Sequence, residues 1–212
     1  WKPSLRFDSI AKANVQQLRV QYRQVLSPSK GYTRTDGKGY LGPRFSSTVR
    51  YNFNYFDRMQ FSVVADKDAG EPFFDSLQPF GFDHYSIQFT LKDIGIIKQL
   101  TLGDYRLNFA EGLAIGQGFS LSYLNTDAII KKRTSGITPH RSSSEYGYNR
   151  GIATNIKILK TNLYLFASID RSDCSTNLQT TGLHRTASEL ATKDSNLTRL
   201  FGFHYEYDNK GL

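Results

Sequence analysis

Residues 44–66 read RFSSTVRYNFNYFDRMQFSVVAD, and apolar and polar side chains alternate on both sides of a short centre. From Val49 to Tyr55 the odd-numbered residues are apolar or aromatic and the residues between them are polar. After residues 56–58 the alternation resumes from Met59 to Ala65. Because successive side chains of a strand point to opposite faces, this segment predicts a β-hairpin with one apolar and one polar face.

The same alternation recurs along most of the chain and predicts eight strands. They are expected at residues 16–26, 45–55, 59–66, 84–92, 98–109, 150–160, 163–171 and 198–207. The connections between them are long and short in strict turn, and a short turn is expected at Thr161-Asn162. This order is typical of an antiparallel up-and-down β-barrel of the outer-membrane kind. We therefore expect residues 1–212 to form a single all-β transmembrane barrel region. Asp208-Asn209-Lys210-Gly211 is a turn signal, which favours a larger barrel over closure of eight strands.

One predicted strand changes its pattern part-way along. Leu100 and Leu102 are even-numbered, whereas Leu107 and Phe109 are odd-numbered, and Gly103 lies where the parity changes. A glycine between two such halves of a strand is typical of a β-bulge. The sequence therefore predicts a bulge at Gly103.

Composition limits the classes of protein to consider. The chain has 212 residues, 14% aromatics, 17 glycines and a formal net charge of +8. No run of 18 apolar residues is present, which excludes a transmembrane helix, but a spanning strand needs only about 9 to 11 residues of alternating polarity. The positive charge favours contact with anions such as nucleic acid, lipopolysaccharide phosphates or acidic glycans. The single cysteine, Cys174, can form no internal disulfide.

Alternation alone does not separate a membrane barrel from a soluble sandwich or lipocalin-like barrel, whose apolar face points inward. Three features favour the membrane. The expected strands have the length needed to cross a bilayer at a tilt, aromatic residues gather towards strand ends, and the polar parity carries large hydrogen-bonding side chains that suit a wet lumen.

Five ordered blocks carry a family resemblance. They are YLGPRFSSTVRYNFNYFDRMQFSVVADKDAGEPFF (40–74), GFDHYSIQFTL (81–91), LGDYRLNFAEGLAIGQGFSL (102–121), SGITPHRSSSEYGYNRGIA (135–153) and GLHRTASELATK (182–193). The chain resembles the β-barrel portion of Bacteroidota outer-membrane proteins often labelled helix-hairpin-helix or ComEA-like. The resemblance implies an outer-membrane location in a Gram-negative bacterium and a barrel with more strands. It does not extend to DNA binding, because these residues contain no helix-hairpin-helix segment.

Polar residues on the expected strands are candidates to line a lumen. They are Arg19, Arg23, Arg50, Asn52, Arg106 and Lys157. The arginines among them could guide anions, since rings of charge tune pore selectivity. The alternative is that they pair with Asp66, Asp104 and Glu206 and so stiffen a narrow barrel.

Residues 110–149 form the longest connection, and we expect an insertion that folds into the lumen as a plug or else stays outside as a solvated loop. Its candidate functional residues, with the arginine that follows it, are Gly112, Gly116, Gly118, Arg133, His140, Arg141, Glu145 and Arg150. The glycines permit close backbone approach and the others supply charge or hydrogen bonds.

The sequence predicts no catalytic residue, no metal ligand set and no cofactor, because the four histidines lack ligand spacing and no nucleophile elbow or phosphate loop occurs. The expected function is a non-enzymatic channel or envelope-complex scaffold that contacts outer-membrane lipid and other envelope proteins, with DNA or macromolecule uptake as one form of it. The alternatives are a structural subunit of a larger outer-membrane assembly and a soluble β-sheet domain that binds carbohydrate or nucleic acid.

Overall fold

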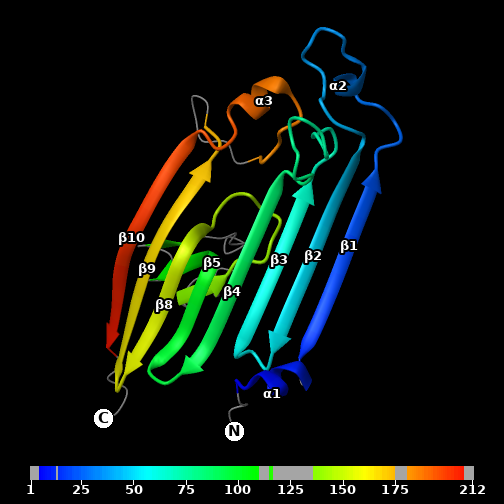
Figure 1. The fold of residues 1–212 in the computed structure, drawn as a ribbon. Helices are drawn as coiled ribbons and strands as arrows, with labels where there is room; N and C mark the ends of the chain where they lie inside the picture. Colours follow the sequence, from blue (N-terminus) through cyan, green and yellow to red (C-terminus); the bar gives the residue numbers. More distant parts are fainter. Residues whose placement is uncertain (1–4, 13, 110–114, 117–135, 175–180, 208–212) are drawn as a thin grey trace, which may run out of the picture.

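The computed structural model describes residues 5–12, 14–109, 115–116, 136–174 and 181–207. They form one antiparallel sheet with three short helices (Figure 1). The strands are β1 (Val15–Gln24), β2 (Phe45–Tyr55), β3 (Met59–Lys67), β4 (His84–Ile94), β5 (Ile97–Phe109), β6 (Ile115–Gly116), β7 (Gly136–Pro139), β8 (Asn149–Ile158), β9 (Thr161–Ser172) and β10 (Asn196–Tyr207). The helices are α1 (Phe7–Lys12), α2 (Lys30–Thr33) and α3 (Ala187–Ala191).

Eight strands follow one another in the order β1-β2-β3-β4-β5-β8-β9-β10, and each pairs with its neighbours. The predicted all-β antiparallel meander is therefore confirmed. The short strands β6 and β7 pair with β5 beside this row. The described residues do not close the sheet into a barrel, since β1 and β10 lie at its two edges (Figure 1).

Long and short connections lie at opposite ends of the sheet, with α2 and α3 at the end that carries the long loops (Figure 1). The last short turn is not where the sequence predicts it. It is formed by Leu159 and Lys160, whereas Thr161 and Asn162 already belong to β9. The turn requires a positive φ at its first residue, and Leu159 adopts 53° there. A leucine is not a turn signal, and the predicted position of the turn, at the polar pair that follows, is wrong.

The two faces of the sheet differ in what they bury. In β4 the side chain of Ile87 is 51% exposed, whereas that of the next residue, Gln88, is 1% exposed. The strand register extends this contrast across the sheet. One row of directly opposed residues is Phe53, Phe61, Phe89, Leu102, Ile152, Ala167 and Phe201. The neighbouring row on the other face begins Gln17, Asn52, Ser62 and Gln88. We call these the apolar face and the polar face.

The bulge predicted at Gly103 is not present. Gly103 pairs in register with Gln88 and with Gly151, and the irregularity of β5 lies between Ile97 and Gln99. The apolar residues of β5 change from even to odd positions because they change face. Leu102 lies on the exposed apolar face, whereas Tyr105 is buried on the polar side of the sheet. Gly103 has φ +89°, and a Cβ there would collide with the carbonyl oxygen of Ile87, so glycine is required at this bend.

Beyond Gly103, β5 separates from β4 and packs over β8 and β9. β7 takes the place of β4 as its partner, through Tyr105 to Asn108. The buried cluster consists of Tyr105, Leu107, Phe109, Ile137, Ala153 and Phe166. The only dry core of the described residues therefore lies on the polar side of the sheet over β8 and β9, where the outer half of β5 and β7 form a second layer.

Candidate functional site

A cavity of about 420 Å³ lies at the long-loop end of the sheet. The ends of β4, β8 and β9 form part of its wall, and described residues of the loops 68–83, 140–148 and 173–195 form the rest. Charged and aromatic side chains of these loops line it, among them Asp83, Glu145, Tyr148, His184 and Lys193. Three segments distant in the sequence therefore meet at one place.

His184 lies at the centre of the polar contacts beside this cavity. Its side chain is 2% exposed, and both ring nitrogens face carboxylates: Nδ1 contacts Asp83, and Nε2 lies 2.7 Å from Asp173. A ring with two carboxylate partners donates from both nitrogens only as the imidazolium. His184 therefore bridges loop 68–83 to loop 173–195 as a buried cation.

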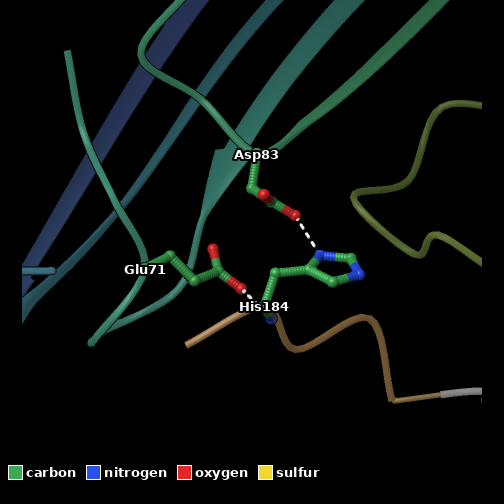
Figure 2. A group of neighbouring side chains, drawn as sticks. All are labelled: Glu71, Asp83 and His184. Atoms are coloured by element: carbon green, nitrogen blue, oxygen red, sulfur yellow. Dashed lines mark hydrogen bonds and ion pairs between the residues drawn. The ribbon is translucent and has the colours of Figure 1, made fainter. Parts of the chain in front are cut away.

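Further hydrogen bonds join the same two loops (Figure 2). The backbone N–H of His184 donates to Glu71 Oε1 at 3.0 Å, and Glu71 Oε2 accepts from the N–H of Asp68 at 2.7 Å. Lys193 Nζ donates to the carboxylate of Asp83 at 2.7 Å and to its carbonyl at 2.9 Å. We call Glu71, Asp83, Asp173, His184 and Lys193 the loop clamp.

The electrostatics of the loop clamp follow from its burial. Burial would raise the pKa of Asp83, but the hydrogen bonds from His184 and Lys193 hold it below its ordinary value. Burial opposes the charge on His184, yet the bond to Asp83 and the charges of Asp83 and Asp173 raise its pKa to about 9. Burial, with the nearby charge of Asp83, raises the pKa of Glu71 to about 7 and that of Glu145 to about 8.

Two sets of side chains bring ligand-type atoms within 4.8 Å of one another: Glu71, Asp83 and His184, and Glu145, Asp173 and His184. Both sets use the ring of His184, whose two nitrogens already contact Asp83 and Asp173. A cation would have to displace the imidazolium proton on one of them. The arrangement as it stands is suited to holding the loops together.

The loop clamp should weaken as pH rises from about 5 to 9. The folded pKa of His184 is raised, so opened loops bind fewer protons than closed loops between pH 6.5 and 9, and closure loses stability through that window. The raised pKa values of Glu71 and Glu145 act in the same direction from about pH 4.5 upward. The lowered pKa of Asp83 acts oppositely, and only below about pH 4.

The measurement is amide hydrogen exchange at His184, corrected for the intrinsic rate at each pH. Each pKa unit by which His184 differs between closed and opened loops changes the equilibrium constant for opening about tenfold. Protection of the His184 amide from exchange should therefore fall by at least about tenfold between pH 5 and 9. Constant or rising protection over this range would contradict the assignment of a buried imidazolium.

The residues predicted to line a lumen lie mostly on the polar face. Arg19 is directly opposite Arg50, and Asn52 is opposite Gln17 and Ser62. Arg23 and Lys157 share the parity of that face in β1 and β8. Arg106 differs, because it lies on the side of β5 opposite the buried Leu107.

The alternative pairing of these arginines is not formed among the described residues. Asp66 accepts a hydrogen bond from Thr48, Asp104 pairs with Arg150, and Glu206 contacts Tyr164 and His204. The physical reason is register. Val64 lies opposite Arg50 on β3, whereas Arg150 lies directly opposite Asp104 on β8.

Part of the segment 110–149 pairs with the sheet. β6 and β7 pair with β5, and Asn149 begins β8. Gly112, Gly118 and Arg133 lie outside the described residues, and Gly116 contributes backbone to β6.

The other predicted residues of this segment are divided among three places. The backbone of His140 donates to Asp104 and its ring stacks on Tyr148 at 4.6 Å; burial lowers its pKa to about 4. Arg141 donates to Gln60, and Glu145 lines the cavity. Arg150 lies in β8, where its guanidinium binds Asp104 and reaches the carbonyl of Tyr85 across the gap left by β5. These contacts are compatible with an inner layer, and whether it acts as a plug stays a prediction.

Sequence reasoning missed the loop clamp. No common spacing marks these five residues, because they come from two loops far apart in the chain that only the meander brings together: Glu71, Asp83, Asp173, His184 and Lys193. The one local signal is Thr186 with Glu189, which form a capping box at the start of α3 and fix the backbone next to His184.

Comparisons with known proteins give no match: no family model matches the chain, and neither a curated protein nor a solved structure is similar to it. Among the described residues, no helix is long and apolar enough to cross a membrane. The resemblance to Bacteroidota outer-membrane proteins therefore stays a prediction.

Proposed function

We propose that this chain forms part of a transmembrane β-barrel in the outer membrane of a Gram-negative bacterium and serves as a non-enzymatic channel or envelope scaffold. The observation that carries the proposal is the inverted burial of the sheet. Phe201 and Phe203 are 83% and 73% exposed on the apolar face, whereas Ser86 and Thr90 are buried on the polar face.

The extent of the apolar face supports lipid over water as the medium that meets it. The row from Phe53 to Phe201 crosses seven strands, so its length is about 29 Å at roughly 4.8 Å per strand. Single exposed apolar residues are ordinary, but soluble monomers rarely expose contiguous apolar patches above a few hundred Å². Acyl chains are the medium that such a face fits. A watery lumen fits the polar face where it is accessible, over β1 and β2, whereas the second layer of β5 and β7 covers it over β8 and β9.

The ends of the sheet fit the same proposal. Outer-membrane barrels have short turns at one end and long loops at the external end. By this rule the loop clamp and its cavity lie outside the membrane, where the clamp would hold the long loops in a fixed arrangement. Outer-membrane lipid would be the principal partner, with other envelope proteins at the loops.

A second candidate is a structural subunit whose sheet pairs with other chains. It is favoured by the two edges, because the backbone of β1 and β10 has no strand partner on one side among the described residues. An open edge is unstable in hydrocarbon, so a membrane-inserted sheet needs further strands at both edges.

The proposal is tested by extracting cell membranes that contain the full-length protein with alkaline carbonate, and by recording current across planar bilayers that contain the purified protein. We expect the protein to stay with the membranes and to conduct ions. Release into the aqueous fraction would contradict the membrane assignment. Membrane retention without current would favour the scaffold over the channel.

A further inference from the structure

We propose that Arg19, Arg50 and Arg141 form a binding site for oxyanions on the polar face of the sheet. The ligand is a small water-borne solute that carries a phosphate, sulfate or carboxylate group. The inference rests on the proposed function, because it assigns the class of solute that the wet face of the barrel would select.

The site is built from two strands and one loop. Arg19 of β1 and Arg50 of β2 are directly opposite each other, a position in which Cβ atoms lie about 4.5 to 5.5 Å apart. Arg50 and Arg141 line one hollow of about 270 Å³, together with Gln17, Asn52 and Asn54. Arg141 enters it from the segment that follows β7 and donates to Gln60 of β3.

Direct ion-pair partners are lacking for these arginines. No ion pair joins Arg19, Arg50 or Arg141 to a carboxylate among the residues that the structure describes. Two carboxylates lie nearby and are engaged by other groups: Asp66 accepts from Thr48 and interacts electrostatically with Arg50, and Asp57 accepts from Asn54 and Gln60. Nε of Arg50 is buried and has no hydrogen-bond partner among the described residues.

Like charges directly opposite each other in a sheet are unfavourable, and a buried N–H without a partner costs further free energy. One oxyanion between the guanidinium groups would offset the like-charge repulsion and would accept a hydrogen bond from the unpaired N–H. Guanidinium presents parallel N–H donors that match the oxygens of phosphate or carboxylate, and the amides of Gln17 and Asn52 supply neutral donors around it. Arg19 and Arg50 lie on the polar face of their strands, which favours a water-borne solute over a lipid headgroup, although Phe53 and Phe61 of the apolar row also line the hollow.

Binding is measured with inorganic phosphate by titration calorimetry on the full-length protein in zwitterionic detergent, which contributes no free anion. Arg50→Gln and Arg141→Gln should each weaken binding roughly tenfold or more, and the double variant should abolish it. Arg50→Lys keeps the positive charge but loses the parallel N–H donors of the guanidinium group. It should therefore weaken phosphate binding while folding is unaffected. Arg34→Gln removes an equal charge from the exposed loop 25–44 and should bind phosphate as the natural protein does.

Absence of phosphate binding by the natural protein, or equal binding by all variants, would overturn the inference. A second readout is the reversal potential of bilayer currents in a KCl gradient. The natural protein should prefer chloride, and the double variant should lose that preference. Current without anion preference would count against the oxyanion site but not against the proposal of a channel. Phosphate binding without current would support the oxyanion site and contradict the proposal of a channel.

Discussion

Replacing Phe203 by arginine should lower the free energy of unfolding in lipid vesicles by about 2 to 4 kcal/mol, the cost of a cationic side chain at the lipid-facing midplane of a barrel. Phe203 is suited to the test because it lies near the middle of β10 (Asn196–Tyr207) and its ring is 73% exposed on the apolar face. In a soluble protein the same substitution would place a charge in water, at almost no cost. Guanidinium unfolding of the full-length protein in vesicles measures the difference.

Thr198→Arg is the matched control, because it adds the same side chain to an exposed position of β10 on the polar face, opposite Asp170 and away from the arginines of the oxyanion site. A wet lumen accepts that charge, so we expect a change within about 0.5 kcal/mol. Equal costs at the two positions, or a larger cost at Thr198, would mean that the two faces do not meet different media.

Replacing Asp83 by alanine should destabilise closure of the long loops by about 3 to 5 kcal/mol, because it leaves the buried His184 cation without one of its two carboxylates. The side chains of Asp83 and His184 are each 2% exposed, so the buried ring depends on its carboxylate partners to compensate its charge. Lys193 loses the same carboxylate. Hydrogen exchange at His184 and at Leu41, whose N–H donates to Arg185, reports closure at two places.

The control for this substitution is Asp36→Ala, which breaks the ion pair with Arg34 at an exposed position of the loop 25–44. Exposed pairs contribute little, so exchange at His184 should stay as in the natural protein. If the two alanine variants open the loops to the same extent, the loop clamp is not what holds the long loops together.

The strands could be predicted from the sequence because the side-chain period of a strand is local. Phe53, Phe61 and Phe89 fall on one parity within their own segments, and register then aligns them across three strands. The assignment of apolar residues to the uncovered face agreed with the structure at Ile87, where the polar neighbour Gln88 is the buried one.

The bend of β5 and the loop clamp could not be predicted, for the same physical reason. Both depend on contacts between residues far apart in the chain, which no local period encodes. At Gly103 the parity change was visible, but it marks a strand that leaves β4 and packs over β8, not a register slip. His184 lies in a loop, and its partners Asp83 and Asp173 are identified only when the strands that carry the loops are aligned.

Thiol labelling in the intact membrane tests directly which medium meets each face of the sheet. In a Cys174→Ser background, Phe203→Cys should react with a lipid-soluble maleimide and resist a charged, membrane-impermeant reagent. Asn52→Cys on the polar face should react with the charged reagent through the watery lumen. Reaction of Phe203→Cys with the charged reagent, together with protection of Asn52→Cys, would contradict the account.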